Sequence, residues 1–333
     1  MYATLDLLQI KVIFLYKTFD FFVYLTMIRQ LKTIFPEKIR CIAITAPAGC
    51  PNNAALVQAV EELKKAVRVK DFIAKPTAET PAYLAADAAD RLACFNAAVN
   101  DPEVDLILAA RGGFGSVHIL SGIDYDTLRR RNLPVMGYSD ITALHCAMLS
   151  QKAGIPISGS NLLQLSEVLN DDLSFVSHKL ALCGCSRPAD IPSPPLQAVN
   201  SQGFAAKTVA GLAYAANLTV LTSLCGTEFM PDFSNKILII EDVNEPVYKI
   251  DRMLEQLRLT GVLKNIAALV FGEFTAPENS TEALTKLFER FAALLDRPCY
   301  KNFAFGHKFP MCAVNSSYTL HTANDQKPFF TLD

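Results

Sequence analysis

The residues best suited to chemistry lie in one short stretch, Ala110 to Ser116, which reads A-R-G-G-F-G-S. The apolar run that precedes it from Val104 is typical of a buried parallel strand, and apolar residues resume at Val117. Three glycines within four positions let the backbone approach a ligand closely, and Ser116 falls where a helix would begin. A serine after such a strand lies at the edge where open α/β sheets hold their active sites.

Three interpretations of this turn compete. Ser116 is a favoured helix N-cap, and the glycines would then be turn residues only. The turn could instead cradle a phosphate, although its spacing matches neither G-x-G-x-x-G nor G-x-x-x-x-G-K-[ST]. As a nucleophile, Ser116 would need a general base and an orienting carboxylate from elsewhere in the chain. The turn alone leaves all three open.

Ser139 is a second candidate nucleophile, and the chain also offers a histidine and two acids that could serve as its partners. Gly137-Tyr-Ser139 begins like a G-x-S-x-G motif, but Ile141 stands where the second glycine belongs. Among five histidines, His307 follows a glycine at the end of an apolar segment. Glu241 and Asp242 directly follow the apolar run 237–240, where a carboxylate can orient a base, although a surface ion pair is the commoner outcome.

The elements around these residues predict an α/β fold with an N-terminal doubly wound parallel sheet, Rossmann-like, because strands and helices alternate. Strands are expected over 39–45, 69–74, 104–110, 133–136, 155–157, 236–240 and 266–271, and helices over 53–67, 82–99, 141–152 and 247–260. Asp90 and Arg91 are expected on the polar side of the second helix. Gly211 to Leu224 is expected to be helical or mixed.

The pattern divides the chain into four parts. Residues 1–36 form an N-terminal extension, residues 37–165 an α/β domain, residues 166–206 a proline-interrupted connection, and residues 207–333 a C-terminal domain. The first 30 residues are apolar, but Lys11, Lys17 and Asp20 interrupt them, so no membrane span is predicted. No signal peptide is predicted either, because this stretch lacks a basic start and a small-residue cleavage site. We expect the natural start at Met27.

Composition narrows the function classes. The 333 residues are 51% hydrophobic, which indicates a globular protein, and a net charge of −2 gives no electrostatic reason to expect nucleic acid as a partner. Nine cysteines occur without a C-x-x-C pair, so no metal site is predicted, and reduced cytoplasmic thiols are the simplest account.

Four motifs in order resemble the LD-carboxypeptidases, serine peptidases of family S66 that are also called muramoyltetrapeptide carboxypeptidases. They are A-R-G-G-F-G-S at 110–116, G-Y-S-D-I-T at 137–142, E-D-V-N-E at 241–245 with Tyr248 and Asp251-Arg252, and F-G-H at 305–307. The resemblance implies a cytoplasmic homodimer that removes the terminal D-alanine from murein tetrapeptides in cell-wall recycling, without metal or cofactor. It also implies that the C-terminal domain is small, β-rich and of swivelling type.

Carried over by position, the resemblance puts the nucleophile on Ser116, the orienting acid on Glu241 and the base on His307. Gly113 would contribute a backbone N–H to the oxyanion hole, and Arg111 is the nearest cation for a substrate carboxylate. The chain departs from the family where Ser158-Gly-Ser160 replaces His-Gly-Pro, where Ala215-Ala-Asn217 replaces Gly-Gly-Asn, and at Cys312.

Two other functions stay open. A microcin-immunity enzyme of the same family would cleave a peptide–nucleotide amide with the same triad. A non-catalytic protein would bind phosphate or a nucleotide at the glycine turn, but that hypothesis gives Glu241 and His307 no role.

Overall fold

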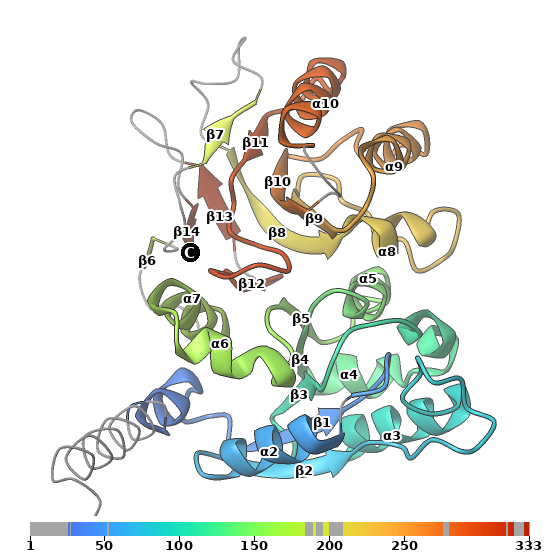
Figure 1. The fold of residues 1–333 in the computed structure, drawn as a ribbon, viewed down its shortest axis with the longest axis vertical. Coiled ribbons are helices and arrows are strands. Elements are labelled where there is room, and N and C mark those ends of the chain that lie inside the picture. Colours follow the sequence, from blue (N-terminus) through green and yellow to red (C-terminus); the bar gives the residue numbers. More distant parts are fainter. Residues whose placement is uncertain are drawn as a thin grey trace, which may run out of the picture.

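The computed structural model describes residues 26, 28–51, 53–183, 189–190, 196–199, 209–275, 280–317, 319–322 and 330–332. Residues 1–25 and 27 of the predicted extension, the expected start Met27 among them, lie outside these ranges, as do residues 184–188, 191–195 and 200–206 of the connection predicted over 166–206. The described chain is built around two sheets that lie one above the other in Figure 1, each with helices packed against it.

The first sheet has six strands in the order β12-β5-β4-β3-β1-β2. The strands are β1 (Cys41–Thr45), β2 (Arg68–Phe72), β3 (Leu106–Ala109), β4 (Pro134–Gly137), β5 (Ile155–Ser158) and β12 (Val314–Asn315). Strands β1 to β5 are parallel, and β12 returns from the far end of the chain to pair antiparallel with β5. The predicted parallel sheet is therefore confirmed.

Helices cover both faces of this sheet, as a doubly wound fold requires. Along β3, Ile107 and Ala109 pack with α3 (Ala88–Asn100), α4 (Tyr125–Arg131) and α5 (Ile141–Ser150). The intervening Leu106 and Leu108 pack on the other face. The helices on that face are α2 (Asn53–Lys64), α6 (Leu165–Leu169) and α7 (Asp172–Cys183).

The end of the predicted N-terminal extension belongs to this core. Residues 28–34 are helical, and Leu31 and Ile34 are fully buried against the face that α2 covers. The last residues of the segment predicted as an extension, 1–36, therefore pack against the first sheet. Leu31 and Ile34 are three residues apart, a spacing that places both side chains on one face of the helix.

The second sheet has eight strands in the order β6-β14-β13-β8-β9-β10-β11-β7. The strands are β6 (Ala189–Asp190), β7 (Gln197–Ala198), β8 (Val209–Asn217), β9 (Ile237–Val243), β10 (Ala268–Thr275), β11 (Cys299–Lys301), β13 (Thr319–Thr322) and β14 (Phe330–Leu332). Its central strands β8 to β11 are parallel. Helices α8 (Leu218–Ser223), α9 (Val247–Leu259) and α10 (Thr281–Leu294) accompany it, so the segment 211–224 is mixed.

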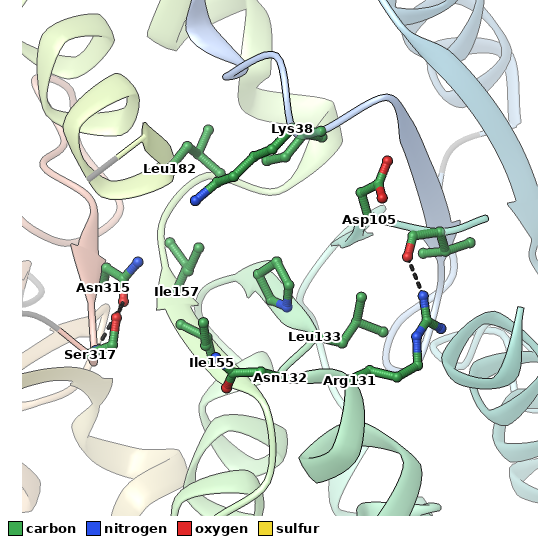
Figure 2. A pocket seen from close by; sticks show the side chains of 13 residues that line it. Lys38, Asp105, Arg131, Asn132, Leu133, Ile155, Ile157, Leu182, Asn315 and Ser317 are labelled. Carbon is green, nitrogen blue, oxygen red and sulfur yellow. Dashed lines mark hydrogen bonds between the residues drawn. The ribbon is translucent and has the colours of Figure 1, made fainter. Parts of the chain in front are cut away.

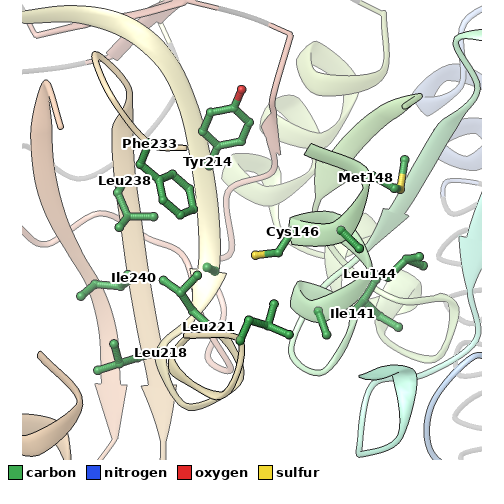
Figure 3. Close-up of a cluster of buried hydrophobic side chains, with 14 of the residues drawn as sticks. Ile141, Leu144, Cys146, Met148, Tyr214, Leu218, Leu221, Phe233, Leu238 and Ile240 are labelled. Carbon is green, nitrogen blue, oxygen red and sulfur yellow. The ribbon is translucent and has the colours of Figure 1, made fainter. Parts of the chain in front are cut away.

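An apolar interface joins the two halves. On α5, the side chain of Cys146 points toward Leu221 of α8 and Tyr214 of β8, whereas Leu144 points to the other side of the helix (Figure 3). These residues belong to one continuous buried cluster that extends from β3 of the first sheet to β9 and β10 of the second. Because close-packed interiors resist deformation, this contact fixes the start of α5 relative to the end of β9.

The described residues contain no helix that is both long enough and apolar enough to cross a bilayer.

Candidate active site

Ser139 occupies a strained turn between β4 and α5. Its backbone φ is +64°, a left-handed conformation that a residue with a Cβ adopts at an energetic cost. Hydrogen bonds from Ile141 N–H to the Tyr138 carbonyl and from Thr142 N–H to the Ser139 carbonyl hold the turn. The side chain of Ser139 is consequently presented at the carboxyl edge of the sheet and is half-buried. A sharp strand-to-helix turn of this kind is how many hydrolases expose a nucleophilic serine.

His307 joins this serine to a buried acid. Its Nε2 lies 3.2 Å from Ser139 Oγ, and its Nδ1 lies 2.8 Å from Glu241 Oε2. With Nδ1 protonated, the ring donates to the carboxylate while Nε2 accepts the serine hydroxyl proton. The three residues follow the order Ser, Glu, His along the chain and come from the turn after β4, from β9 and from the segment after β11. Both sheets contribute to the site.

Glu241 is completely buried at the end of β9. Burial raises the pKa of its carboxyl, and the hydrogen bonds from His307 and Asn217 act in the opposite direction. The Asn217 amide donates to Glu241 Oε1 and to Asp242 Oδ1, both at 3.1 Å. Asp242 is engaged elsewhere, because its other oxygen accepts the N–H and the hydroxyl of Thr219. Of the two predicted acids, only Glu241 contacts His307.

The residues around His307 fix its ring. The Tyr138 ring packs against it at a centroid distance of 5.0 Å, and burial raises the pKa of the Tyr138 hydroxyl to about 12. Gly306 has a φ of +152°, and a Cβ there would stand 2.7 Å from Glu273 Cβ and 3.3 Å from Glu241 Oε2. The glycine before the histidine therefore permits a close backbone approach to the acid.

The glycine turn after β3 lies against Ser139. A Cβ added to Gly112 would stand 2.9 Å from Ser139 Cβ and 3.1 Å from its Oγ. Gly113 has a φ of +104° and passes close to Gly49, whose N–H donates to the Gly112 carbonyl at 3.0 Å. The absence of a side chain at Gly112 thus allows the glycine turn to pack against the turn between β4 and α5, which holds Ser139.

The side chain of Ser116, the predicted nucleophile, contacts Asp140 and not His307. Its side chain is completely buried at the first position of a short 3-10 helix, η1 (Ser116–Gly122). Its hydroxyl donates to the Asp140 carbonyl at 2.6 Å, and its N–H donates to Asp140 Oδ2 at 2.8 Å. Gly115, with a φ of +117°, turns the chain so that Ser116 points inward. The serine that meets His307 is Ser139, the rival that the failed G-x-S-x-G match had set aside.

Arg111 and the departures from the family pattern form ordinary contacts. Arg111 is exposed, and its Nη1 donates to the Cys50 carbonyl at 2.8 Å. Ser158 donates to the Ala215 carbonyl, and Ser160 N–H donates to His178 Nε2. Cys312 is buried in the apolar core of the second half.

Asn217 is a site residue that sequence inspection noted only as part of a variant motif. Its Oδ1 accepts the N–H of Val220 and caps α8, while its amide holds the two acids. An asparagine directly before a helix is a recognisable N-cap signal, but the contact with Glu241 depends on the register of β8 against β9.

Two further features of the described residues are the distribution of possible metal ligands and a cavity at the first sheet. Nowhere in the described ranges do three His, Cys, Asp or Glu side chains group as metal ligands. A cavity of about 360 Å³ opens where β4 and β5 begin, with Leu133, Ile155 and Arg131 in its lining (Figure 2). Because parallel strands run from this edge toward Ser139, the cavity is at the opposite end of the sheet from the triad.

Two sheets that bring a serine, a histidine and a buried glutamate together define a serine-hydrolase type of site on an α/β scaffold. The models of the LD-carboxypeptidase N-terminal and C-terminal domains match residues 42–159 and 210–319. The chain is 31% identical to the "Probable murein peptide carboxypeptidase" of Bacillus subtilis over 82% of its length and 85% of that protein.

Solved structures share the fold. The muramoyltetrapeptide carboxypeptidase of Oxalobacter formigenes aligns with a TM-score of 0.72 at 24% identity, covering 88% of this chain and 97% of the other. The microcin C7 self immunity protein MccF, in complex with aspartyl sulfamoyl adenosine, aligns with a TM-score of 0.76 at 20% identity, covering 89% and 96%. The chain belongs to the LD-carboxypeptidase family of serine peptidases, S66.

Proposed function

We propose that the protein is a serine LD-carboxypeptidase that releases the terminal D-alanine from murein tetrapeptides, with Ser139 as nucleophile, His307 as base and Glu241 as orienting acid. The observation that carries the proposal is the hydrogen-bonded chain of Glu241, His307 and Ser139, at 2.8 and 3.2 Å. Family membership supplies the reaction class, and the murein relative supports the substrate class.

In the first step, His307 Nε2 takes the hydroxyl proton as Ser139 Oγ attacks the carbonyl carbon of the L,D amide. An Oγ–C bond forms, and the C–N bond breaks when the imidazolium returns the proton to the leaving D-alanine nitrogen. Water then attacks the ester with His307 again as base, and the shortened peptide leaves. Glu241 keeps the imidazole in the productive tautomer and stabilises its charged form.

Two backbone groups suit the oxyanion. They are the N–H of Gly113, in the glycine turn that touches Ser139, and the N–H of Asp140, which follows the nucleophile. Removal of one such donor costs about 3 kcal/mol of transition-state stabilisation in other enzymes.

Arg111 is our proposal for the cation that binds the terminal carboxylate of the substrate. It is exposed beside the glycine turn, and its contact with the Cys50 carbonyl uses one of several guanidinium donors. A guanidinium matches a carboxylate in two-point geometry. In keeping with a role in cell-wall recycling, we further propose a cytoplasmic homodimer.

A related amide hydrolase is the second candidate, because the fold also aligns with MccF in complex with aspartyl sulfamoyl adenosine. Such an enzyme would use the same triad on a peptide–nucleotide bond. The sequences are too distant for that alignment to favour its substrate.

The test is mass analysis of a murein tetrapeptide and, separately, an aminoacyl sulfamoyl adenosine after incubation with the purified protein. Loss of one alanine from the tetrapeptide, absent with Ser139→Ala, supports the proposal. Cleavage of the adenosine compound alone would support the second candidate. Tight binding of that compound with cleavage of neither would favour a binding protein.

A further inference from the structure

Arg91 is a buried charge beside the site. It lies on α3 with only 2% of its surface exposed, although the sequence places it on the polar side of that helix. Its Nε donates to the Ala86 carbonyl at 2.9 Å, and its Nη1 donates to the carbonyls of Pro47 and Gly115. Its Nη2 lies 3.3 Å from His118 Nδ1. The predicted exposure of Arg91 is therefore wrong.

The three carbonyls that Arg91 binds come from loops that meet at the carboxyl edge of the first sheet. Pro47 follows β1, Gly115 follows β3, and Ala86 precedes α3. The approach to Gly115 is so close that a Cβ there would stand 3.2 Å from Arg91 Nη1. The Arg91 side chain thus links three loops that pack at and beside the glycine turn.

Burial of this guanidinium is unfavourable by itself. Burial lowers the pKa of Arg91, and the negative charge of Asp140 opposes that shift. Within the described chain, Arg91 makes no ion pair with a carboxylate at contact distance. In some proteins a buried polar or charged group serves to specify one conformation.

Ser116 continues the connection toward the nucleophile. It follows Gly115 in the chain, and both its N–H and its hydroxyl donate to Asp140. Asp140 in turn follows Ser139. The path from Arg91 to the nucleophile therefore consists of hydrogen bonds and two adjacent peptide links, all within buried residues apart from half-buried Ser139.

We infer that Arg91 and Ser116 are positioning residues, which hold the glycine turn and Asp140 in register so that Gly113 and Asp140 N–H groups converge beside Ser139 Oγ. The inference rests on the proposed serine mechanism but not on the murein substrate. Neither side chain touches the reacting atoms. Their loss lets the two turns shift relative to each other, and a misplacement of about 1 Å lowers rates by about 100-fold.

The variants are Ser116→Ala, which removes the hydroxyl only, and Arg91→Lys, which keeps the charge but not the fork of donors. Arg131→Lys is the matched control, because Arg131 also binds two backbone carbonyls, those of Val99 and Val104, but beside the cavity at the opposite edge (Figure 2). All three variants lose hydrogen bonds to the backbone, so all are expected to melt at lower temperature.

The measurement is the rate at which a fluorophosphonate labels Ser139, read beside kcat and KM for tetrapeptide. In labelling, an Oγ–P bond forms, the P–F bond breaks, and His307 takes the hydroxyl proton, so the rate reports the oxyanion site whatever the natural substrate. We expect labelling and kcat to fall by about 10- to 100-fold in Ser116→Ala and Arg91→Lys, with KM unchanged. Arg131→Lys is expected to label at the parent rate.

Parent-like labelling in folded Ser116→Ala and Arg91→Lys, or an equal loss in Arg131→Lys, would overturn the inference. If Arg91→Lys fails to fold, Ser116→Ala alone decides. A parent protein that labels at Ser139 but releases no alanine would defeat the murein proposal while the variant rates still test the positioning role.

Discussion

Two turns at the carboxyl edge of the first sheet carry a serine each, and they differ in a way that sequence patterns conceal. The turn after β3 has three glycines, and its Ser116 is fully buried with both polar groups bound to Asp140. The turn after β4 places Ser139 at a φ of +64° and directs its hydroxyl to His307. Glycines mark the turn that comes close to Ser139, while a left-handed backbone conformation marks Ser139 itself, the proposed nucleophile.

The difference follows from hydrogen bonding. A hydroxyl has one proton, and the proton of Ser116 is directed to a carbonyl at 2.6 Å inside the protein. Ser139 shares its proton with an imidazole that a buried carboxylate orients. Only the second arrangement can pass the proton on during attack.

The largest expected effect is the contrast between alanine variants at the two serines. Ser139→Ala removes the nucleophile, and kcat should fall by about 10⁴-fold or more, whereas Ser116→Ala should retain measurable turnover. Steady-state kinetics on murein tetrapeptide measures both. Full activity in Ser139→Ala would remove the β4 turn from the mechanism.

Glu241→Gln tests the acid behind the histidine. The amide keeps the volume but cannot stabilise an imidazolium, and the equivalent change in a comparable triad lowers kcat by about 10⁴-fold. Asp242→Asn is the matched control, because Asp242 contacts Asn217 and Thr219 rather than His307. Turnover of each variant should be measured beside its melting temperature. Near-normal turnover in Glu241→Gln would contradict the orienting role.

Gly112→Ala probes the contact between the two turns. The new Cβ would stand 2.9 Å from Ser139 Cβ, so one turn must move, and kcat should fall by about 100-fold. Gly226→Ala is the control: its φ of +85° strains a side chain, but no atom lies within 4 Å of the new Cβ. It should melt at a lower temperature with normal kcat. Equal kcat in the two variants would show that the turns do not need close contact.

The smallest expected effect is a loss of folding stability at low pH, caused by a buried histidine next to β4. His145 of α5 has an Nε2 that lies 3.1 Å from the Val135 carbonyl of β4, and burial lowers its pKa to about 4 from 6.5. Between pH 6.5 and pH 4, His145 is protonated in the unfolded chain but neutral in the folded chain. The free energy of unfolding therefore falls as the pH falls through this window. The difference amounts to about 3 kcal/mol for one fully buried group.

Denaturant titration at pH 7 and at pH 4.5 measures this loss. His145→Gln removes the titrating group and should reduce the difference between the two pH values, whatever its own stability. His178, whose pKa burial also lowers to about 4, contributes in the same direction and remains in the variant. An unchanged pH dependence in His145→Gln would show that His145 does not control it.

Much of the fold could be predicted because central strands such as β1 and β3 are buried on both faces. Runs such as the one that forms β3 are continuously apolar, which distinguishes them from amphipathic helices. The segment 209–223 was harder to assign, since its alanines suit both states, and pairing of β8 with β9 decides in favour of a strand up to Asn217. The burial of Arg91 escaped prediction because its partners are backbone carbonyls from distant loops.

The site could be predicted only in part. The motifs indicate Glu241 and His307, and Oε2 of the glutamate lies 2.8 Å from Nδ1 of the histidine. The choice between Ser116 and Ser139 depends on a dihedral angle and on which hydroxyl reaches His307 across the two halves. Neither quantity is encoded in local spacing, and Ile141 in place of a glycine argues against the turn whose serine contacts His307.

The most direct test of the central claim is the position of a fluorophosphonate adduct. Trypsin separates the two serines, because Ser116 falls in the peptide 112–129 and Ser139 in the peptide 132–152. Tandem mass spectrometry of the labelled, digested protein should locate the adduct on Ser139, with no labelling after Glu241 or His307 is replaced by alanine. An adduct on Ser116 would contradict the account and return the nucleophile to the glycine turn.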